Sequence, residues 1–257
     1  MALVKILRTV RQQGIRSAWH KVAKVAPGYL GGVGHWRVGR CQCCQRLTVF
    51  LAHRNCSPEF RACLFCSANE RYELLAAEIR QRFGDKLSDM SILELDPRSP
   101  LKPLLSGARK YTRSFFEEGC SSGERDGAVC EDITALKFDN HSLDLIISSD
   151  VLEHVPYLDK AFSETARVLK PGGAHIFTVP PRAMTRKRAV IKDGKVVHIE
   201  PPEHHLDPLS PEGVLAFWDI GPDLPTALLT EGLDIRIVRG PVGDAGRVVW
   251  IAERVAG

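Results

Sequence analysis

The stretch "LDLIISSDVLEHVPYLDKAFSETARVLKPGGAHIFTVP" (143–180) decides the fold of this chain. Its beginning (143–149) and its end (175–180) are apolar runs typical of buried strands. Between them lies a segment that predicts an amphipathic helix, with one face formed by Leu158, Ala161, Phe162, Thr165 and Leu169. Lys170, Pro171, Gly172 and Gly173 supply the stop signals of that helix. A strand, a helix and a strand in this order predict a parallel sheet covered by helices.

The same alternation continues on both sides of this stretch. Residues 70–84 predict a helix with Leu75, Ile79 and Phe83 on one face, and residues 91–95, 110–115 and 128–133 predict further strands. Near the end, "DIRIVRG" (234–240) and "GRVVWIAERV" (246–255) predict an antiparallel hairpin at the edge of the sheet. The fold class predicted for the body is therefore α/β.

The first loop of this pattern, "LDPRSPLK" (95–102), contains no glycine. A nucleotide-type cofactor loop normally has two or three glycines at this point, which let the ligand touch the backbone. Pro97 and Pro100 can shape a tight turn instead, and Ser99 with Pro100 predicts the start of a short helix that ends near Gly107.

Residues 131–180 closely resemble the central motifs of class I S-adenosylmethionine-dependent methyltransferases of the type 11 kind. The resemblance implies a Rossmann-like, seven-stranded sheet whose last strand is antiparallel. It also implies that Asp132 and Ile133 contact the adenine, and that "SSDVLEHV" (148–155) passes beneath the methionine and the methyl group. S-adenosylmethionine is accordingly the expected cofactor. Its expected binding residues are Glu94, Asp96, Arg98, Ser114, Asp132, Ile133, Ser148, Ser149 and Asp150.

Physical chemistry supports these cofactor residues in different ways. Glu94, Asp132 and Asp150 fall near the ends of strands, where carboxylates can accept hydrogen bonds from amine donors. Arg98 could pair with the methionine carboxylate, or could be a surface arginine. The family has an acidic residue at the end of its second strand to hold the ribose, whereas this chain has Ser114 there. Each carboxylate could also be a capping or solvated group.

The segment 186–208 follows the last parallel strand and is expected to lie over the mouth of the site. It resembles a bacterial subgroup of these methyltransferases, which carries a Pro-Pro-Glu-x-His-x-Asp-Pro motif and often an N-terminal Cys-x-x-Cys ribbon. Here the motif is residues 201–208, and His205 takes the position of the histidine. His205 and His154 are the candidate catalytic proton acceptors. His154 could instead only order its loop, and Arg188 and His198 are expected to flank the site.

Six of the eight cysteines lie between residues 41 and 66. Two Cys-x-x-Cys pairs, Cys41 with Cys44 and Cys63 with Cys66, have the spacing of two knuckles that hold one tetrahedral zinc ion. Cys43 could replace Cys44, and Cys43 and Cys56 are otherwise spare. Four cysteine ligands leave no open position, so this predicts a structural zinc ribbon.

The charge is unevenly distributed along the chain. Residues 1–58 contain ten Lys or Arg and no Asp or Glu, and the rest carries 25 basic and 31 acidic residues. We expect a basic helical leader (1–36), a four-cysteine module (37–69) and a methyltransferase domain (70–257). The leader could contact an anionic membrane surface, pack on the body or be a tail. Without a signal peptide or a transmembrane run, we expect a cytoplasmic protein, peripheral to the inner face of the membrane if the leader binds lipid.

Three functions fit these observations. The first is a methyltransferase acting on a small-molecule or glycan-linked acceptor. The second is a methyltransferase-like scaffold without activity, which the loop without glycine would favour. The third is an RNA methyltransferase that uses the zinc module to hold RNA. Nucleic acid is the less favoured partner because the body is acidic and the ribbon has few aromatic residues for stacking.

Overall fold

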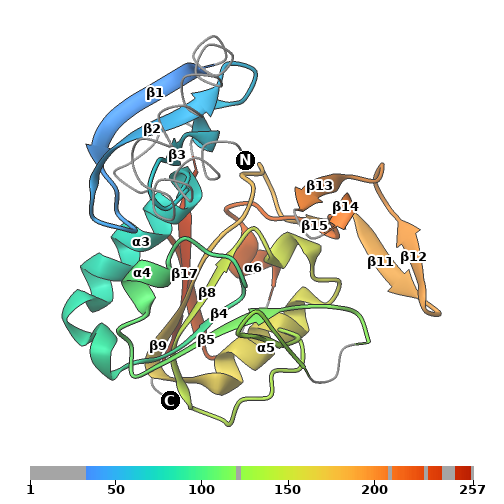
Figure 1. Cartoon of the computed structure of the whole chain (residues 1–257). Helices are drawn as coiled ribbons and strands as arrows, with labels where there is room; N and C mark the ends of the chain where they lie inside the picture. The colour runs from blue at the N-terminus through green and yellow to red at the C-terminus, as the bar shows by residue number, and fades with distance from the viewer. Residues whose placement is uncertain (1–32, 120–122, 208–209, 229–230, 239–246, 256–257) are drawn as a thin grey trace.

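The computed structural model describes residues 33–119, 123–207, 210–228, 231–238 and 247–255. Its body is an eight-stranded sheet in the order β16-β17-β9-β8-β4-β5-β7-β6. The strands are β4 (Ser91–Glu94), β5 (Lys110–Phe115), β6 (Glu124–Arg125), β7 (Ala128–Cys130), β8 (Leu143–Ser149), β9 (Leu169–Thr178), β16 (Leu233–Val238) and β17 (Val249–Arg254). Figure 1 shows this sheet in the middle of the molecule.

The predicted fold class is confirmed. The strands β9, β8, β4, β5 and β7 are parallel, and β17, the last strand of the described chain, runs antiparallel between β9 and β16. The eighth strand is the two-residue β6, which pairs antiparallel with β7 at the edge. The sheet is thus the expected seven-stranded one with a short addition.

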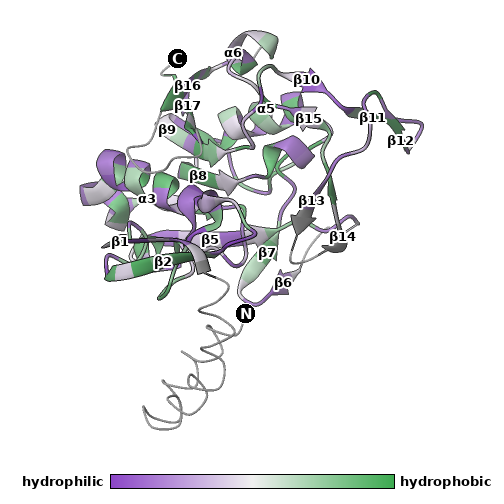
Figure 2. Cartoon of the chain, turned by 90° about the horizontal axis from the view of Figure 1, so that it is seen from above, coloured by the Kyte–Doolittle hydropathy of each residue, from purple (hydrophilic) through white to green (hydrophobic). Residues whose placement is uncertain are grey.

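Helices cover both faces of the sheet, as the continuous apolar strands require. The helix α3 (Glu70–Phe83) buries Leu75 and Ile79 against Ile92 and Ile147 on one face. The helix α5 (Leu158–Val168) buries Phe162 in a second cluster on the other face. Figure 2 shows hydrophilic and hydrophobic residues on different parts of α3, as expected for an amphipathic helix. The other helices of the described residues are α4 (Lys102–Leu105), α6 (Leu224–Ala227) and the 3-10 turns η1 (Pro58–Phe60), η2 (Gly84–Asp89) and η3 (Leu152–His154).

Two predicted helix boundaries are wrong. Residues 169–173 were expected to end a helix, but α5 ends at Val168 and Leu169 begins β9. The proline at position 171 disfavours the helical conformation at Lys170, so the chain becomes extended before it. The short helix expected from Ser99 begins only at Lys102, because the Ser99 hydroxyl accepts the Leu101 N–H (3.0 Å) in a turn that precedes α4.

An N-terminal module precedes the body. Its three-stranded antiparallel sheet consists of β1 (Val33–Arg40), β2 (Leu47–His53) and β3 (Ala62–Cys63). It lies against α3 in Figure 1, and Phe50 and Cys63 share a core cluster with α3 and the main sheet. The strand β1 was not predicted from the sequence. Residues 1–32, which make up most of the expected leader, lie outside the described residues.

Between β9 and α6 the chain forms three small antiparallel pairs. These are β10 (Arg186–Lys187) with β15 (Trp218–Asp219), β11 (Ala189–Lys192) with β12 (Lys195–His198), and β13 (His204–Asp207) with β14 (Ser210–Leu215). Figures 1 and 2 both show the β11–β12 hairpin projecting away from the main sheet. In the part of the chain that the structure describes, no helix is both long and apolar enough to cross a membrane.

Candidate functional site

The residues predicted to hold the cofactor lie where the parallel strands end. Glu94 is the last residue of β4, Ser149 is the last of β8, and Ser114 is the penultimate residue of β5. Asp132 and Ile133 follow β7. Because parallel strands end at a common edge, the structure places this set at the edge where ligands of open α/β sheets bind.

Glu94 is the most deeply buried carboxylate at this edge, with 1% of its surface exposed. The Tyr111 hydroxyl donates to one carboxylate oxygen, and the Ser114 hydroxyl donates to the Glu94 carbonyl (3.2 Å). The other oxygen, Oε1, is buried without a hydrogen-bond partner among the described residues. Burial raises the pKa of Glu94 to about 8, although the nearby hydroxyls of Ser99 and Tyr111 act in the opposite direction. This site therefore has room for one further donor.

The first loop keeps its shape through side chains instead of glycines. Asp96 accepts the backbone N–H of Arg98 (2.7 Å), and the Tyr72 hydroxyl donates to its second oxygen. Arg113 of β5 donates to the Pro97 carbonyl (2.5 Å). The Arg98 side chain is exposed. The Asp96 carboxylate and the Pro97 carbonyl of this loop are therefore already bonded within the protein.

Asp150 follows β8 in the left-handed conformation (φ 52°), which aspartate tolerates better than most residues. Its carboxylate lies between two arginines. Arg71 of α3 forms an ion pair with it, and Arg247 lies 3.3 Å away. The Thr178 hydroxyl also donates to it (3.0 Å), and Arg247 pairs with Glu59 of the N-terminal module. The predicted cofactor residue Asp150 is thus held by donors of the protein itself.

The other predicted cofactor residues differ in whether their side chains have a polar atom left for a ligand. The Ser148 hydroxyl shares a hydrogen bond with buried His175 (2.9 Å), so it is directed into the packed sheet. Asp132 accepts the backbone N–H and the hydroxyl of Thr134, both at 2.8 Å and both on the same oxygen. Ile133 is buried in the core cluster that contains α5. Asp132 is therefore a loop-capping carboxylate that keeps a second oxygen.

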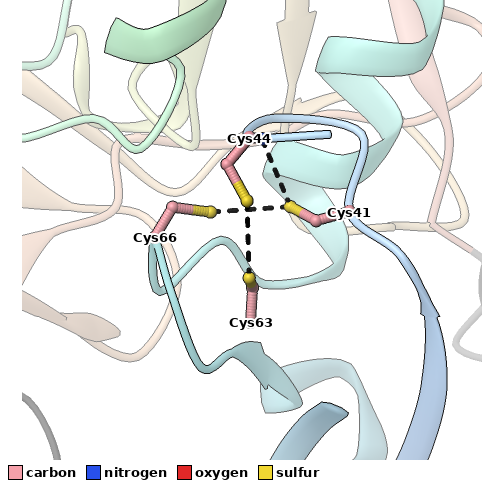
Figure 3. Close-up of side chains that lie close together, drawn as sticks. All are labelled: Cys41, Cys44, Cys63 and Cys66. Atoms are coloured by element: carbon pink, nitrogen blue, oxygen red, sulfur yellow. Dashed lines mark hydrogen bonds between the residues drawn. The ribbon is translucent and has the colours of Figure 1, made fainter. Parts of the chain in front are cut away.

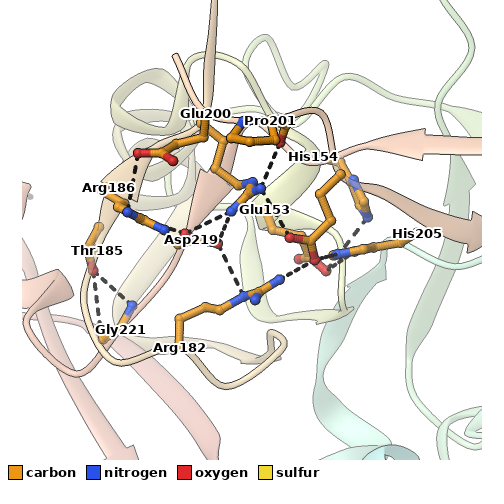
Figure 4. Close-up of polar contacts among 12 residues, drawn as sticks. Glu153, His154, Arg182, Thr185, Arg186, Glu200, Pro201, His205, Asp219 and Gly221 are labelled. Atoms are coloured by element: carbon orange, nitrogen blue, oxygen red, sulfur yellow. Dashed lines mark hydrogen bonds and ion pairs between the residues drawn. The ribbon is translucent and has the colours of Figure 1, made fainter. Parts of the chain in front are cut away.

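The two predicted catalytic histidines lie together beside Glu153, as Figure 4 shows. Their rings are 4.9 Å apart in an edge-to-face arrangement. His154 Nδ1 donates to the Leu215 carbonyl (2.9 Å), and His205 Nε2 donates to Glu203 (3.1 Å). Glu153 Oε1 lies 3.5 Å from His205 Nδ1 and 3.7 Å from His154 Nε2. The nearby carboxylate of Glu153 raises the pKa of His205.

A network of arginines and carboxylates supports this cluster (Figure 4). Asp219 is buried, and Arg182, Arg186 and Arg188 lie 3.2, 2.8 and 3.1 Å from it. Burial alone would raise the pKa of Asp219, but these arginines together lower it. Glu203 pairs with Arg182 and with Arg188 (3.3 Å). The predicted flanking residue Arg188 is therefore a buried structural cation, and its predicted companion His198 is exposed on β12.

Figure 3 shows the sulfur atoms of Cys41, Cys44, Cys63 and Cys66 converging on one point. All four lie within 4.8 Å of one another, with 3.5 Å between Cys41 and Cys66 and 3.8 Å between Cys44 and Cys63. Zinc–sulfur bonds of about 2.3 Å in a tetrahedron place the sulfurs about 3.8 Å apart. This four-cysteine cluster is therefore compatible with zinc. Cys44, and not Cys43, completes it, whereas the Cys43 thiol donates to the Tyr72 carbonyl (3.4 Å).

The four-cysteine cluster contacts the start of α3. The Cys41 thiol and the Gln42 N–H both donate to Glu73 Oε1, at 3.0 and 2.9 Å. Glu73 follows Arg71 and Tyr72, whose side chains reach Asp150 and Asp96 at the sheet edge. One helical turn thus joins the four-cysteine module to the edge that carries the candidate cofactor residues.

The family model described as Methyltransferase domain matches residues 112–177, which run from β5 to β9. The match shows that these residues carry a methyltransferase domain, and the sheet around them has the strand directions expected for the class I fold. The resemblance expected from the sequence is thereby confirmed for about a quarter of the chain.

Two curated relatives match part of the chain. An uncharacterized protein of Methanocaldococcus jannaschii is 35% identical over 74 residues, which cover 29% of this chain and 32% of that protein. The malonyl-[acyl-carrier protein] O-methyltransferase of a Methylovorus species is 29% identical over 128 residues, which cover 49% of this chain and 39% of that protein. The chain thus spans about a third of the length of these relatives.

Solved structures are similar at low identity. The Burkholderia thailandensis 1,6-didemethyltoxoflavin-N1-methyltransferase has a TM-score of 0.46 and 14% identity, covering 70% of this chain and 76% of that one. An S-adenosylmethionine-dependent methyltransferase from Mesorhizobium loti has a TM-score of 0.44 and 18% identity, covering 66% of this chain and 93% of that one. Neither of these similarities identifies a substrate of this chain.

Several residues of the candidate site were not found from the sequence. Arg71, Tyr72, Glu153, Asp219 and Arg247 all make central polar contacts. A signal existed only for Glu153, which lies inside the "SSDVLEHV" motif next to His154. The others come from elements whose contact with the edge depends on the three-dimensional arrangement.

Proposed function

We propose that this protein transfers a methyl group from S-adenosylmethionine to a small-molecule or glycan-linked acceptor in the cytoplasm. The methyltransferase domain match and the polar groups at the carboxyl edge of the sheet support this proposal. Bound S-adenosylmethionine supplies an electrophilic methyl group on a cationic sulfur.

The observation that carries the proposal is the unpartnered oxygen of Glu94. A buried carboxylate oxygen without a donor among the described residues is costly, and an amine of a bound ligand would satisfy it. Ser114 and Tyr111 fix the position of Glu94 from the neighbouring strand. Asp132 has one carboxylate oxygen that could accept a hydrogen bond from the adenine of the cofactor. These residues of the chain fit a cationic, amine-bearing cofactor.

The acceptor is expected beside Glu153 and His154, which follow β8, and beside His205, which belongs to β13 in the 186–208 segment. Alignment of the acceptor behind the methyl group supplies most of the acceleration in such reactions. His205 and His154 are the groups that could take up a proton there. His205 already bonds Glu203 through one nitrogen, so its other nitrogen faces the cluster.

We propose a structural role for a zinc ion held by the four cysteines. Four thiolates would complete its coordination, so it would stabilise the module and leave the chemistry to other groups. The module, in turn, would hold the start of α3 through Glu73.

A transfer experiment tests the proposed activity. Protein and S-adenosylmethionine with a radiolabelled methyl group are incubated with fractionated extract containing small molecules, glycan-linked lipids, RNA or protein. We expect label in the small-molecule or glycan-linked fraction, and much less with His205→Ala than with the exposed control His198→Ala. Label in the RNA fraction would support the RNA alternative instead.

An inactive scaffold is the second candidate, and one observation favours it. Asp96 and Asp150, two residues predicted to bind cofactor, already bond to Tyr72 and Arg71. If these bonds make Asp96 and Asp150 unavailable to the cofactor, the protein will not bind S-adenosylmethionine and no fraction will accept label.

A further inference from the structure

Glu153 is a buried carboxylate without conventional partners. It is 2% exposed, and neither of its oxygens has a hydrogen-bond partner among the described residues. A buried charge is normally paired or coordinated to a metal, because an isolated one is expensive. A bound cation would therefore offset the unfavourable free energy of burying the Glu153 carboxylate.

Two imidazole nitrogens face this carboxylate. The carbonyl of Leu215 can only accept, so the proton of His154 is on Nδ1 and its lone pair is on Nε2. The carboxylate of Glu203 likewise accepts from His205 Nε2, which leaves Nδ1 turned toward Glu153. Metal-binding histidines typically have this kind of second partner, which fixes the ring and its tautomer.

The distances suit a metal ion. Glu153 Oε1 lies 3.5 Å from His205 Nδ1 and 3.7 Å from His154 Nε2, and the three ligand atoms lie within 4.8 Å of one another. Tetrahedral metal bonds of about 2.0–2.2 Å to nitrogen and oxygen place neighbouring ligands about 3.4 Å apart. Only a small adjustment separates the observed arrangement from coordination.

We propose that Glu153, His154 and His205 bind a divalent transition-metal ion, at a site separate from the four-cysteine cluster. Two imidazoles and one carboxylate suit zinc, iron or cobalt better than magnesium. Three protein ligands leave open positions, unlike the four thiolates of the N-terminal module. If the proposed function holds, an oxygen of the acceptor would take an open position, and the imidazoles would act through the metal instead of as free bases.

The test uses the full chain with zinc retained in its four-cysteine cluster. The protein is titrated with Co²⁺, and bound cobalt and zinc are measured by mass spectrometry alongside the visible spectrum. We expect about one cobalt per chain beyond the retained zinc, without the charge-transfer band that thiolate ligands give. No extra cobalt at about 1 mM, or cobalt bound only with a thiolate band, would overturn the proposal.

Matched variants locate the site. Glu153→Gln and His205→Ala should abolish the extra cobalt, and Glu203→Gln should weaken it by about 10- to 100-fold because it orients His205. Glu200→Gln is the control, since Glu200 pairs with Arg186 outside the cluster. Equal binding by Glu153→Gln and the unmodified protein would contradict the proposal. If Glu153→Gln does not fold, cobalt binding by the unmodified chain and by Glu203→Gln still tests the proposed metal site.

Cofactor titration by calorimetry keeps this inference distinct from the proposed function. If the protein binds S-adenosylmethionine but no extra cobalt, only the proposal of the metal site is contradicted. Extra cobalt without binding of S-adenosylmethionine would remove only the methyltransferase proposal.

Discussion

Arg71, in the first turn of α3, forms an ion pair with Asp150, which follows β8 at the carboxyl edge of the sheet. The two residues are 79 positions apart in the chain. Tyr72 and Glu73, the next residues of the same turn, bond to Asp96 and to the four-cysteine module. This turn therefore connects the N-terminal module with the candidate cofactor edge.

Arg71→Met should lower the free energy of unfolding by about 1–3 kcal/mol, because the mostly buried Asp150 loses one of its two arginine partners. Arg125→Met is the matched control, since the Arg125–Glu117 pair is exposed and should cost less than about 1 kcal/mol. Urea unfolding measures both. If both variants lose the same free energy of unfolding, the Arg71–Asp150 ion pair stabilises the fold no more than an exposed pair does.

The zinc prediction can be checked on purified protein. We expect about one tightly bound zinc per chain, and Cys63→Ser should lower both the zinc content and the solubility. Cys56→Ser should change neither, because Cys56 is exposed and lies outside the four-cysteine cluster. A metal-free preparation that stays folded and soluble would rule out a structural zinc ion.

Stability should fall as the pH rises, in part because of Glu94. Burial raises its pKa to about 8 from an ordinary value of 4.5, and Tyr111, Asp96 and Arg113 surround it. Between these values the folded chain holds a proton that the unfolded chain releases. Stability then decreases with pH by up to about 1.4 kcal/mol per unit, and the decrease ends above the folded pKa.

Glu94→Gln should therefore reduce the slope of unfolding free energy against pH, measured without cofactor by urea unfolding at several values between about pH 5 and 8. The exposed residue Glu118 provides the control variant Glu118→Gln, which should keep the original slope. Parallel curves for Glu94→Gln and the unmodified protein would mean that Glu94 is ionised in the folded state.

The basic leader remains a prediction, because residues 1–32 lie outside the described residues. Liposomes containing anionic lipid, at low salt, should sediment the full chain more than a shortened chain that begins at Gly34 if the leader binds membranes. Each nearby Lys or Arg would contribute about 1 kcal/mol. If both chains stay in solution, the leader packs on the body or is a tail.

The central strands could be predicted because their signal is local. The strands at 110–115 and 143–149 have the predicted boundaries. For 143–149 the signal is a largely apolar and mostly buried run, which is read directly from the sequence. The four cysteines of the cluster could likewise be chosen from their spacing, and the structure brings them together. The end of α5 was misjudged because the proline acts on the residue before it.

The polar contacts at the edge could not be predicted in the same way. Arg71 reaches Asp150, and Glu153 reaches His205, only after strands and helices distant in sequence have packed together. Ser148 shows the same limit. It was expected at the cofactor, but the alternation of the strand turns its hydroxyl toward His175 instead.

The central claim is that the carboxyl edge of the sheet binds S-adenosylmethionine, and titration calorimetry with this cofactor and with S-adenosylhomocysteine tests it most directly. We expect saturable binding of both by the unmodified protein and by the control Asp139→Ala, which changes an exposed residue of the same loop. Asp132→Ala should bind some 10- to 100-fold more weakly, because a charge-assisted hydrogen bond is worth roughly 1.5–3 kcal/mol. No detectable heat from either ligand at high micromolar concentration would contradict the account.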